Sequence, residues 1–430
     1  MYSISPIDGR YSKTTEPLTH IFSEGALIKY RVKVELYYLS LLSNTVPELE
    51  LFSLESANHI INNLVEDDLH TVKEIESKTK HDVKAVEIFL QSKLDLHYHS
   101  FIHFGLTSQD INSVVYLMQL HDTVSTYLLP MINELLEKIN ILAFSSDHPM
   151  VCFTHGQSAT PSNMKLQLLV FVERLCNLYH ELQKIPFKTK FGGATGRFNA
   201  HRLAYPDVNW ERFGQDFLQI INPNFQKHQY TTQIDHYDNH SNFYNKMQQI
   251  STVLIDFCQD IWLYISKAYF TQRVTEDEVG SSTMPHKVNP INFENAEGNL
   301  HMAVTLFQFL SRKLPISRLQ RDLTDSTVLR NMGIPFGHFF IAYDSLLKGI
   351  DKLTLNSEQL KKELEDSPQL LAEGIQTILR KCGYKDAYDK LKKITRYTNL
   401  TRDTLINFVL LLDIPKEEKQ KLMNLRVSNY

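Results

Sequence analysis

Apolar residues recur along much of the chain at steps of three and four, with polar residues between them, which is the spacing of one face of an α-helix. The longest such segment covers residues 238–278, and at 1.5 Å rise per residue a helix of that length extends roughly 60 Å. A single helix cannot bury so long an apolar face alone, so the pattern predicts packing against other helices. The apolar positions of this segment are Ile250, Val253, Leu254, Phe257, Ile261, Tyr264, Ile265 and Ala268.

Helix-breaking residues are rare over the same parts of the chain. Between the prolines at 47 and 130 the one glycine is Gly105, and between those at 223 and 285 it is Gly280. Interior proline costs a helix about 3 kcal/mol and interior glycine about 1 kcal/mol, so such gaps favour helices. Three further helices are expected, over residues 114–143 with a kink at Pro130, over residues 164–185 and over residues 301–314.

Strand patterns are sparse. Residues 188–207 form one glycine-rich irregular segment, and residues 230–234 (YTTQI) indicate one short extended piece. We therefore predict an all-α protein, with a central bundle of long helices at residues 111–345 and smaller helical domains at residues 1–110 and 346–430. A bundle shared between subunits is the economical way to cover such helices. The alternative, a monomeric helical solenoid, is disfavoured because the chain has no repeat of about 30 to 45 residues.

Composition and charge argue against several classes of function. The net charge of −4 argues against a nucleic-acid partner, and the lack of a run of about 18 apolar residues argues against a membrane span. The first residues lack the order of a signal peptide, and the four cysteines are scattered without a CxxC pair, so we expect a cytoplasmic protein. The chain also lacks an HExxH motif, and we expect no metal.

Residues 280–290 (GSSTMPHKVNP) interrupt the long helical pattern with two hydroxyls, two prolines and a lysine. We interpret this segment as a mobile catalytic loop that carries a serine base. Backbone amides near Ser281 and Ser282, together with Lys287, can stabilise an alkoxide or another anion. On chemistry alone, a helix-terminating turn is an equally good interpretation.

The string GSSTMPHKVNP resembles the signature loop of the fumarase/aspartase superfamily. Members of that superfamily share a central bundle of long helices in a homotetramer and an elimination that releases fumarate or a close analogue. Other blocks, in the same order along the chain, resemble the adenylosuccinate lyase family in its longer bacterial form. They are PIDGRY with Arg10 and Tyr11, KHDVKAVE with Lys80, His81 and Asp82, FGLTSQDIN with Thr107 and Ser108, THGQSATP with His155, TTQID with Gln233, NFENAEGN with Asn295, and RDLTDSTVLRN with Arg321, Ser326 and Arg330.

The resemblance implies a reaction and a role for each of several residues in it. The substrates are adenylosuccinate, which yields AMP, and the succinylated aminoimidazole carboxamide ribotide; both lose fumarate without any cofactor. Ser281 matches the family's general base and His155 its general acid, a task that suits histidine because its pKa of about 6.5 lies near operating pH. Lys287 and Asn289 hold the carboxylate on which charge accumulates, and His81 supports His155.

The resemblance also implies contacts to a nucleotide. It places Arg10, Tyr11, Ser326 and Arg330 at phosphate and ribose, Arg321 at the substrate's polar groups, and Thr107, Ser108 and Gln233 at the succinyl part; Lys80, Asp82 and Asn295 complete the predicted set. In the family each site is built from three subunits, so we expect an inactive monomer. Departures from the family pattern are Lys80, Gln109 and Ser158.

Each of these residues also has a plainer interpretation when taken alone. His81 and His155 are then structural histidines, Thr107 and Ser108 an N-cap, and the two arginines solvated charges. The glycines of residues 192–196 are interpreted as a turn, because GGATGR lacks a phosphate-loop pattern.

Other readings of the whole chain stay open. They are a carboxymuconate cycloisomerase-like enzyme, argininosuccinate lyase, fumarase, aspartase, and a non-catalytic helical scaffold derived from a lyase.

Overall fold

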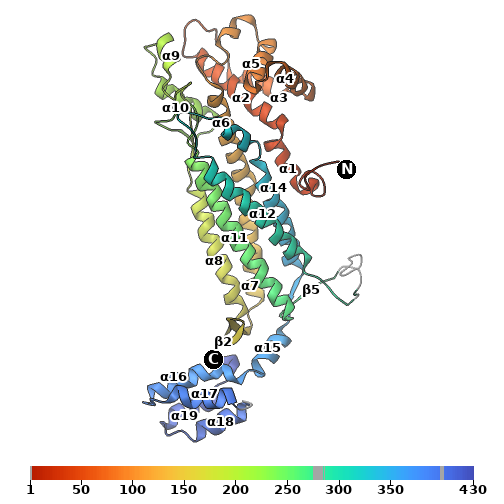
Figure 1. Cartoon of the computed structure of the whole chain (residues 1–430), viewed down its shortest axis with the longest axis vertical. Helices are drawn as coiled ribbons and strands as arrows, with labels where there is room; N and C mark the ends of the chain where they lie inside the picture. The colour runs from red at the N-terminus through yellow and green to blue at the C-terminus, as the bar shows by residue number, and fades with distance from the viewer. Residues whose placement is uncertain (1, 275–283, 285, 398–400) are drawn as a thin grey trace. The chain divides into compact units, whose positions relative to one another are not determined.

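The computed structural model describes residues 2–274, 284, 286–397 and 401–430. The chain divides into two compact units, each described separately below. Unit 1 comprises Met1–Glu134, Asn177–Ile255 and Asn295–Asp344, and unit 2 comprises Leu135–Cys176, Asp256–Glu294 and Ser345–Tyr430. Helices dominate both units, and the strands described form three two-stranded sheets (Figure 1). The predicted all-α class is therefore confirmed, whereas the predicted division at residues 110 and 345 stays a prediction.

Unit 1 is built around helix α2, whose apolar residues are buried around most of its circumference. Helix α2 is capped by Ser23, whose hydroxyl accepts from the amide of Ala26, and it packs against α3, α4, α5, α6 and α10 (Figure 1). Its Tyr38 ring meets Phe191, Phe213 and Phe217 in the apolar core. The elements of unit 1 are α1 (Ser12–Phe22), α2 (Glu24–Ser43), α3 (Leu54–Asn62), α4 (Glu66–Thr79), α5 (Asp82–Lys93), η1 (Leu96–Phe101), α6 (Ser108–Asp122), η2 (Thr123–Leu128), β3 (Phe187–Thr189), α9 (Asn199–Ala204), α10 (Trp210–Ile221), β4 (Phe225–Lys227) and α13 (Thr324–Leu329), with β3 and β4 parallel.

Five long helices form the bundle that the apolar spacing predicts. They are α7 (Leu129–Ser145), α8 (Met164–Gln183), α11 (Asp238–Ser266), α12 (Ile291–Lys313) and α14 (Gly333–Lys352) (Figure 1). In unit 1, Tyr244 of α11 packs against Phe307 of α12 and Phe336 of α14. In unit 2, Phe257 of α11 packs against Phe171 of α8 and Phe293 of α12.

Helix α11 is shorter than the prediction of residues 238–278, because it ends at Ser266. Ala268 takes a left-handed backbone with φ 58°, the Tyr269 amide donates to Tyr264 and the Ala268 amide to Ile265. This pair of bonds is a Schellman C-cap, which usually places glycine where Ala268 stands. The chain then enters strand β5 (Phe270–Gln272), antiparallel to β6 (Leu353–Leu355).

The remaining helix predictions hold with shifted ends. Residues 108–145 are helical throughout, with the π-helical turn η2 just before Pro130. Pro130 has no amide hydrogen to donate, which interrupts the regular hydrogen bonds of the α-helix at this point. Helix α8 matches its prediction closely, and α12 starts ten residues before 301, directly after Pro290. Residues 230–234 form no strand, so that prediction is wrong, while residues 192–196 form a turn as expected.

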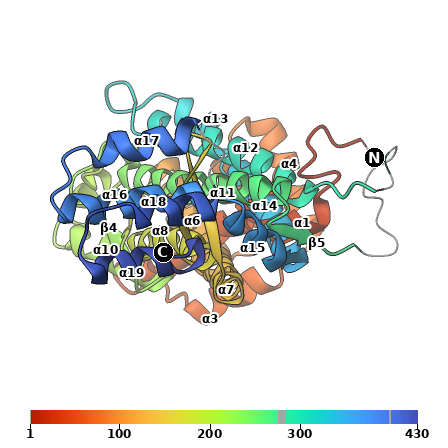
Figure 2. The same ribbon diagram turned by 90° about the horizontal axis from the view of Figure 1, so that it is seen from below.

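Unit 2 contains a β-hairpin that the sequence analysis missed and a group of short helices. Strands β1 (Pro149–Thr154) and β2 (Gln157–Asn163) are antiparallel, and Val151 of β1 packs against Leu364 and Leu370. Helices α16 and α17, and α18 and α19, pack in pairs over a small apolar core (Figure 2). These elements are α15 (Ser357–Glu365), η3 (Pro368–Leu371), α16 (Ala372–Lys381), α17 (Ala387–Tyr397), α18 (Arg402–Leu410), α19 (Lys416–Asn424) and η4 (Val427–Asn429).

Among the described residues, no helix combines the length and the apolar character needed to cross a membrane. The four cysteines are all free thiols, and only Cys258 is fully buried.

Candidate active site

His81 and Ser108, predicted site residues 27 positions apart, meet in unit 1. His81 is the N-cap of α5, and its Nδ1 accepts the amide of Lys84 at 3.2 Å. Because an accepting Nδ1 carries no proton, the proton of the neutral ring sits on Nε2. Nε2 then donates to Ser108 Oγ, 3.3 Å away, at the first residue of α6. About half of the surface of the His81 side chain is exposed, so a ligand can reach the imidazole.

Asp82, the next residue, is held by two arginines. Arg31 Nη2 lies 2.6 Å from Asp82 Oδ2, and Arg330 Nη2 lies 3.4 Å from the same oxygen. Burial alone would raise the pKa of Asp82, but the charge of Arg31 and hydrogen bonds from Val83 and Arg31, with the more distant charge of Arg330, lower that pKa overall. Asp82 is therefore a fixed negative charge that orients Arg330.

Arg330 itself is only loosely paired. Its second contact is Glu24 at 3.6 Å, and about half of its side chain is exposed. Charge-assisted hydrogen bonds are typically about 2.7–2.9 Å long, so both carboxylate contacts of Arg330 are weak. The guanidinium can therefore turn toward a stronger anion.

Ser326, Arg321 and Gln233 form a second group of predicted site residues. Arg321 donates to Gln233 Oε1 at 3.1 Å and to Ser326 Oγ at 3.3 Å. Gln109, the neighbour of Ser108, also donates to Ser326 Oγ at 3.2 Å. Gln109 is fully buried, and its side chain links the start of α6 to α13. Gln109, one of the departures from the family pattern, thus contacts Ser326, a predicted substrate-binding residue.

The start of α6 is anchored by Asp110. Its carboxylate accepts the amides of Thr107 at 2.9 Å and of Gly192 at 2.8 Å, and Lys190 Nζ lies 2.6 Å away. Thr107 is the N-cap of α6, as the plainer interpretation predicted, and Asp110 is its partner three residues on. Asp110 and Lys190 are both completely buried, so Thr107 and Ser108 are held on a rigid support.

The remaining predicted residues of unit 1 make fewer contacts. Tyr11 Oη accepts from Asn295 Nδ2 at 3.2 Å, which brings the start of the chain to α12. Arg10 lies over the Tyr11 ring, 5.8 Å from its centroid. Lys80 closes α4 in a left-handed conformation with φ 56°, and its side chain is exposed.

His155 stands at the tip of the β1–β2 hairpin in unit 2. Thr154 pairs with Gln157, so His155 and Gly156 form a two-residue turn, with φ of 53° and 70°. Positive φ at both central residues is the signature of a type I′ turn, which matches the twist of the strands. The turn presents the imidazole to solvent, and the pair His-Gly was the signal by which this hairpin could have been found.

Lys287 and Asn289 lie before α12 in unit 2. The Lys287 amide donates to Met284, the Lys287 side chain is exposed and Asn289 is half-buried. Ser281, the predicted base, lies outside the described residues.

The structure also identifies functional candidates that were not predicted. Arg31 is 4% exposed, holds Asp82 and donates from Nε to Asn112 at 3.0 Å. A charged residue among the buried apolar positions of α2 was the available signal. Three other buried polar residues also hold predicted site residues in place: Gln109, Asp110 and Lys190.

Two family models match the chain. The model described as "Lyase" matches residues 9–304, and the model described as "Adenylosuccinate lyase C-terminal" matches residues 317–430. The adenylosuccinate lyase of Dictyostelium discoideum is 44% identical, with 100% of this chain and 96% of that protein covered. The adenylosuccinate lyases of Buchnera aphidicola subsp. Acyrthosiphon pisum and Haemophilus influenzae are each 42% identical over the same shares.

Two solved structures share the fold. A fumarate lyase from Mesorhizobium sp. BNC1 superposes with a TM-score of 0.74 at 15% identity, covering 96% of this chain and 94% of that one. A 3-carboxy-cis,cis-muconate lactonizing enzyme from Pseudomonas putida gives 0.76 at 18% identity, covering 96% and 93%. These two similarities show the fold alone. The full-length relatives and the matching family models show that the chain belongs to the adenylosuccinate lyase family of the fumarase/aspartase superfamily.

Proposed function

We propose that the chain is an adenylosuccinate lyase, which eliminates fumarate from adenylosuccinate to give AMP and from the succinylated aminoimidazole carboxamide ribotide to give the free amide. The observation that carries the proposal is the similarity of the whole chain to relatives named adenylosuccinate lyase, at 42–44% identity for the three compared above. The polar cluster of unit 1 supports it, since residues from five distant segments converge there in the way a nucleotide site requires.

In the proposed reaction one C–H bond and one C–N bond break. Ser281 Oγ takes the proton beside the carboxylate, and the electron pair moves first into that carboxylate as an aci-carboxylate dianion. The pair then forms the double bond of fumarate as the C–N bond breaks, and His155 protonates the departing nitrogen. Lys287 and Asn289 stabilise the dianion by charge and hydrogen bonding. Both lie in the segment directly before α12, with Lys287 exposed and able to reach a ligand.

The part assigned to His81 agrees with its hydrogen bonds. Nδ1 is engaged by the Lys84 amide, so the ring is held in one orientation with Nε2–H toward Ser108. A ring held in this orientation can give its Nε2–H to an anionic oxygen of the substrate in place of Ser108 Oγ, and can thereby support the acid His155.

The phosphate is assigned to Arg330, Arg10, Tyr11 and Ser326. Arginine suits the task because its planar fork matches two phosphate oxygens at once. The weak contacts of Arg330 to Asp82 and Glu24 support the assignment, since a dianionic phosphate can replace them. Arg31 keeps Asp82 satisfied while this happens.

We further propose a homotetramer whose active sites combine residues of different subunits. Large apolar side chains are more than 40% exposed on α7, α8, α11 and α12, which a second copy of the bundle would cover. These residues are Ile141, Phe144, Leu166, Val170, Trp262, Leu263, Ile291, Met302 and Phe309. The enzyme is proposed to act in the cytoplasm, without nucleic acid, membrane or metal in catalysis, and the three-part division into residues 1–110, 111–345 and 346–430 is kept as part of this proposal.

The experiment that tests the proposal is a spectrophotometric assay of fumarate release from adenylosuccinate, run beside argininosuccinate, malate and aspartate. We expect turnover of adenylosuccinate and of the succinylated ribotide only. Turnover of argininosuccinate, malate or aspartate in place of the purine substrates would replace the proposal with another member of the superfamily. A folded assembly inactive on all of these substrates would favour the alternative of a non-catalytic helical scaffold.

A further inference from the structure

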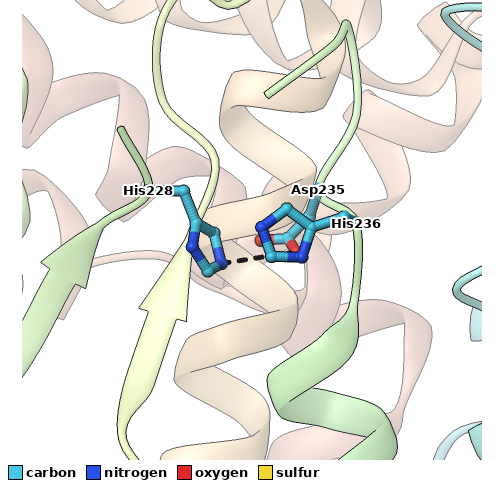
Figure 3. A group of neighbouring side chains, drawn as sticks. All are labelled: His228, Asp235 and His236. Carbon is cyan, nitrogen blue, oxygen red and sulfur yellow. Dashed lines mark ion pairs between the residues drawn. The ribbon is translucent and has the colours of Figure 1, made fainter. Parts of the chain in front are cut away.

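Two histidines and an aspartate come together beside strand β4 in unit 1. Figure 3 shows His228 just after β4, facing Asp235 and His236 from the segment that leads into α11. His228 Nε2 lies 3.8 Å from Asp235 Oδ1, and the two imidazole centroids are 4.0 Å apart. One nitrogen or oxygen of each residue lies within 4.8 Å of the others.

Two ring nitrogens of this group lack the hydrogen bonds expected of buried polar atoms. His228 Nε2 and His236 Nδ1 are both inaccessible to solvent, and neither makes a hydrogen bond with a described residue. His236 Nδ1 has Asp238 Oδ2 at 3.0 Å, whereas His228 Nε2 has only Asp235 Oδ1 at 3.8 Å. A buried polar atom without a hydrogen bond is unfavourable by about 1–3 kcal/mol, and a bound ion would remove this cost for His228.

The carboxylate of Asp235 is fixed in position. Its Oδ2 accepts the amide of Lys190 at 2.9 Å, and its Oδ1 accepts the amide of Tyr237 at 2.7 Å. Each oxygen keeps a second lone pair, and hydrogen bonds of this kind orient the carboxylates that bind metals. Imidazole nitrogens and a hydrogen-bonded carboxylate are the donor set of a zinc-class ion.

We propose that His228, Asp235 and His236 bind one divalent transition-metal ion of the zinc class. Metal–ligand bonds of about 2.0–2.2 Å in a tetrahedron place neighbouring ligand atoms about 3.3–3.6 Å apart. His228 Nε2 and Asp235 Oδ1 are 3.8 Å apart, and the ligand atoms of all three residues lie within 4.8 Å of one another, so side-chain rotations bring them onto one ion.

The ion would join the end of β4 to the beginning of α11 and close the loop of residues 229–234. That loop carries Gln233, the partner of Arg321, so the metal would act on the loop's rigidity rather than on the chemical step. The site does not depend on the proposed function, because none of its three residues belongs to the catalytic or substrate-binding set.

The test uses the untagged full-length protein, stripped with a chelator, and titrates it with zinc chloride by calorimetry and with cobalt chloride by visible absorption. We expect one ion per chain and the intense visible bands of four-coordinate cobalt. His228→Ala and His236→Ala should each raise the Kd at least about 100-fold, since even the loss of an outer-shell partner typically weakens metal binding 10–100-fold.

The matched control is His97→Ala, because His97 also faces a carboxylate, Glu50 at 3.2 Å, but belongs to no group of three possible metal ligands among the described residues. It should leave zinc binding unchanged. No saturable binding by the wild-type protein, or equal binding by wild type, His236→Ala and His97→Ala, would overturn the proposal. His236 is 40% exposed, so its replacement tests the site even if His228→Ala fails to fold.

Discussion

Asp110→Asn is the substitution whose effect the structure predicts most sharply. Asp110 and Lys190 have no exposed surface, and their 2.6 Å contact is the one ion pair among the described residues with both side chains fully buried. The Asp110 carboxylate also accepts the amides of Thr107, Gly192 and Gly193. Burial lowers the pKa of Lys190, and the charge of Asp110 opposes that shift.

The magnitude follows from what each replacement leaves unpaired. Removing one partner of a buried ion pair costs about 3–5 kcal/mol, because the other charge stays buried without compensation. Asp110→Asn also points an amide group at three backbone donors, so we expect a loss near the upper end of that range. Lys190→Met leaves the carboxylate with three hydrogen bonds and should cost less. The double variant should be less unstable than the two single losses added together.

The assay is urea unfolding of the full-length proteins, with hydrogen exchange of the Gly192 and Gly193 amides as a local readout. The control is Lys138→Met, which breaks the partly exposed pair with Asp351 and should change the midpoint far less. The reasoning is refuted if Asp110→Asn costs less than about 1 kcal/mol, or if Lys190→Met proves the more damaging of the two.

Two further predictions concern Arg330 and His201. Arg330→Ala should raise KM for adenylosuccinate about 10- to 100-fold, the equivalent of one or two charge-assisted hydrogen bonds, with kcat little changed; an unchanged KM would contradict the phosphate assignment. His201 is fully buried, with Nδ1 unpartnered, and burial lowers its pKa to about 4. Because the pKa of His201 in the folded chain lies below the ordinary 6.5, the unfolded chain takes up the proton first as the pH falls. His201 therefore contributes about 3 kcal/mol to the free energy of unfolding above pH 6.5, and this contribution is lost as the pH falls toward 4. His201→Gln should flatten that part of the stability curve, exposed His180→Gln should not, and equal acid sensitivity in both variants would contradict the assignment.

Helical periodicity predicted the bundle because its signal is long. In α12, Phe293, Ala296, Leu300, Ala303 and Phe307 are all buried at helical spacing. The ends of helices depend on short-range backbone geometry that composition records poorly. Helix α11 ends at Ser266, and its cap has Ala268 in place of a glycine, since the hydrogen bonds to Tyr264 and Ile265 compensate for the strained backbone of Ala268.

The site residues were predicted by family resemblance rather than by pattern. Periodicity gave no reason to join His81 to Ser108 or Gln109 to Ser326, because such contacts depend on how helices pack. Supporting residues were missed for the same reason. Arg31 looks like one more charge on a helix until its burial beside Asp82 is known, and the spacing of His228 and Asp235 corresponds to no short metal motif.

The most direct test of the proposed chemistry is subunit complementation between Ser281→Ala and His155→Ala. Each variant alone should assemble and release almost no fumarate from adenylosuccinate. If one subunit supplies the base and another the acid, a randomly mixed assembly made by co-expression holds both intact groups in about a quarter of its sites. We expect mixed tetramers to recover roughly that share of wild-type activity. Mixed tetramers no more active than the parent variants, or a fully active monomer, would contradict the account.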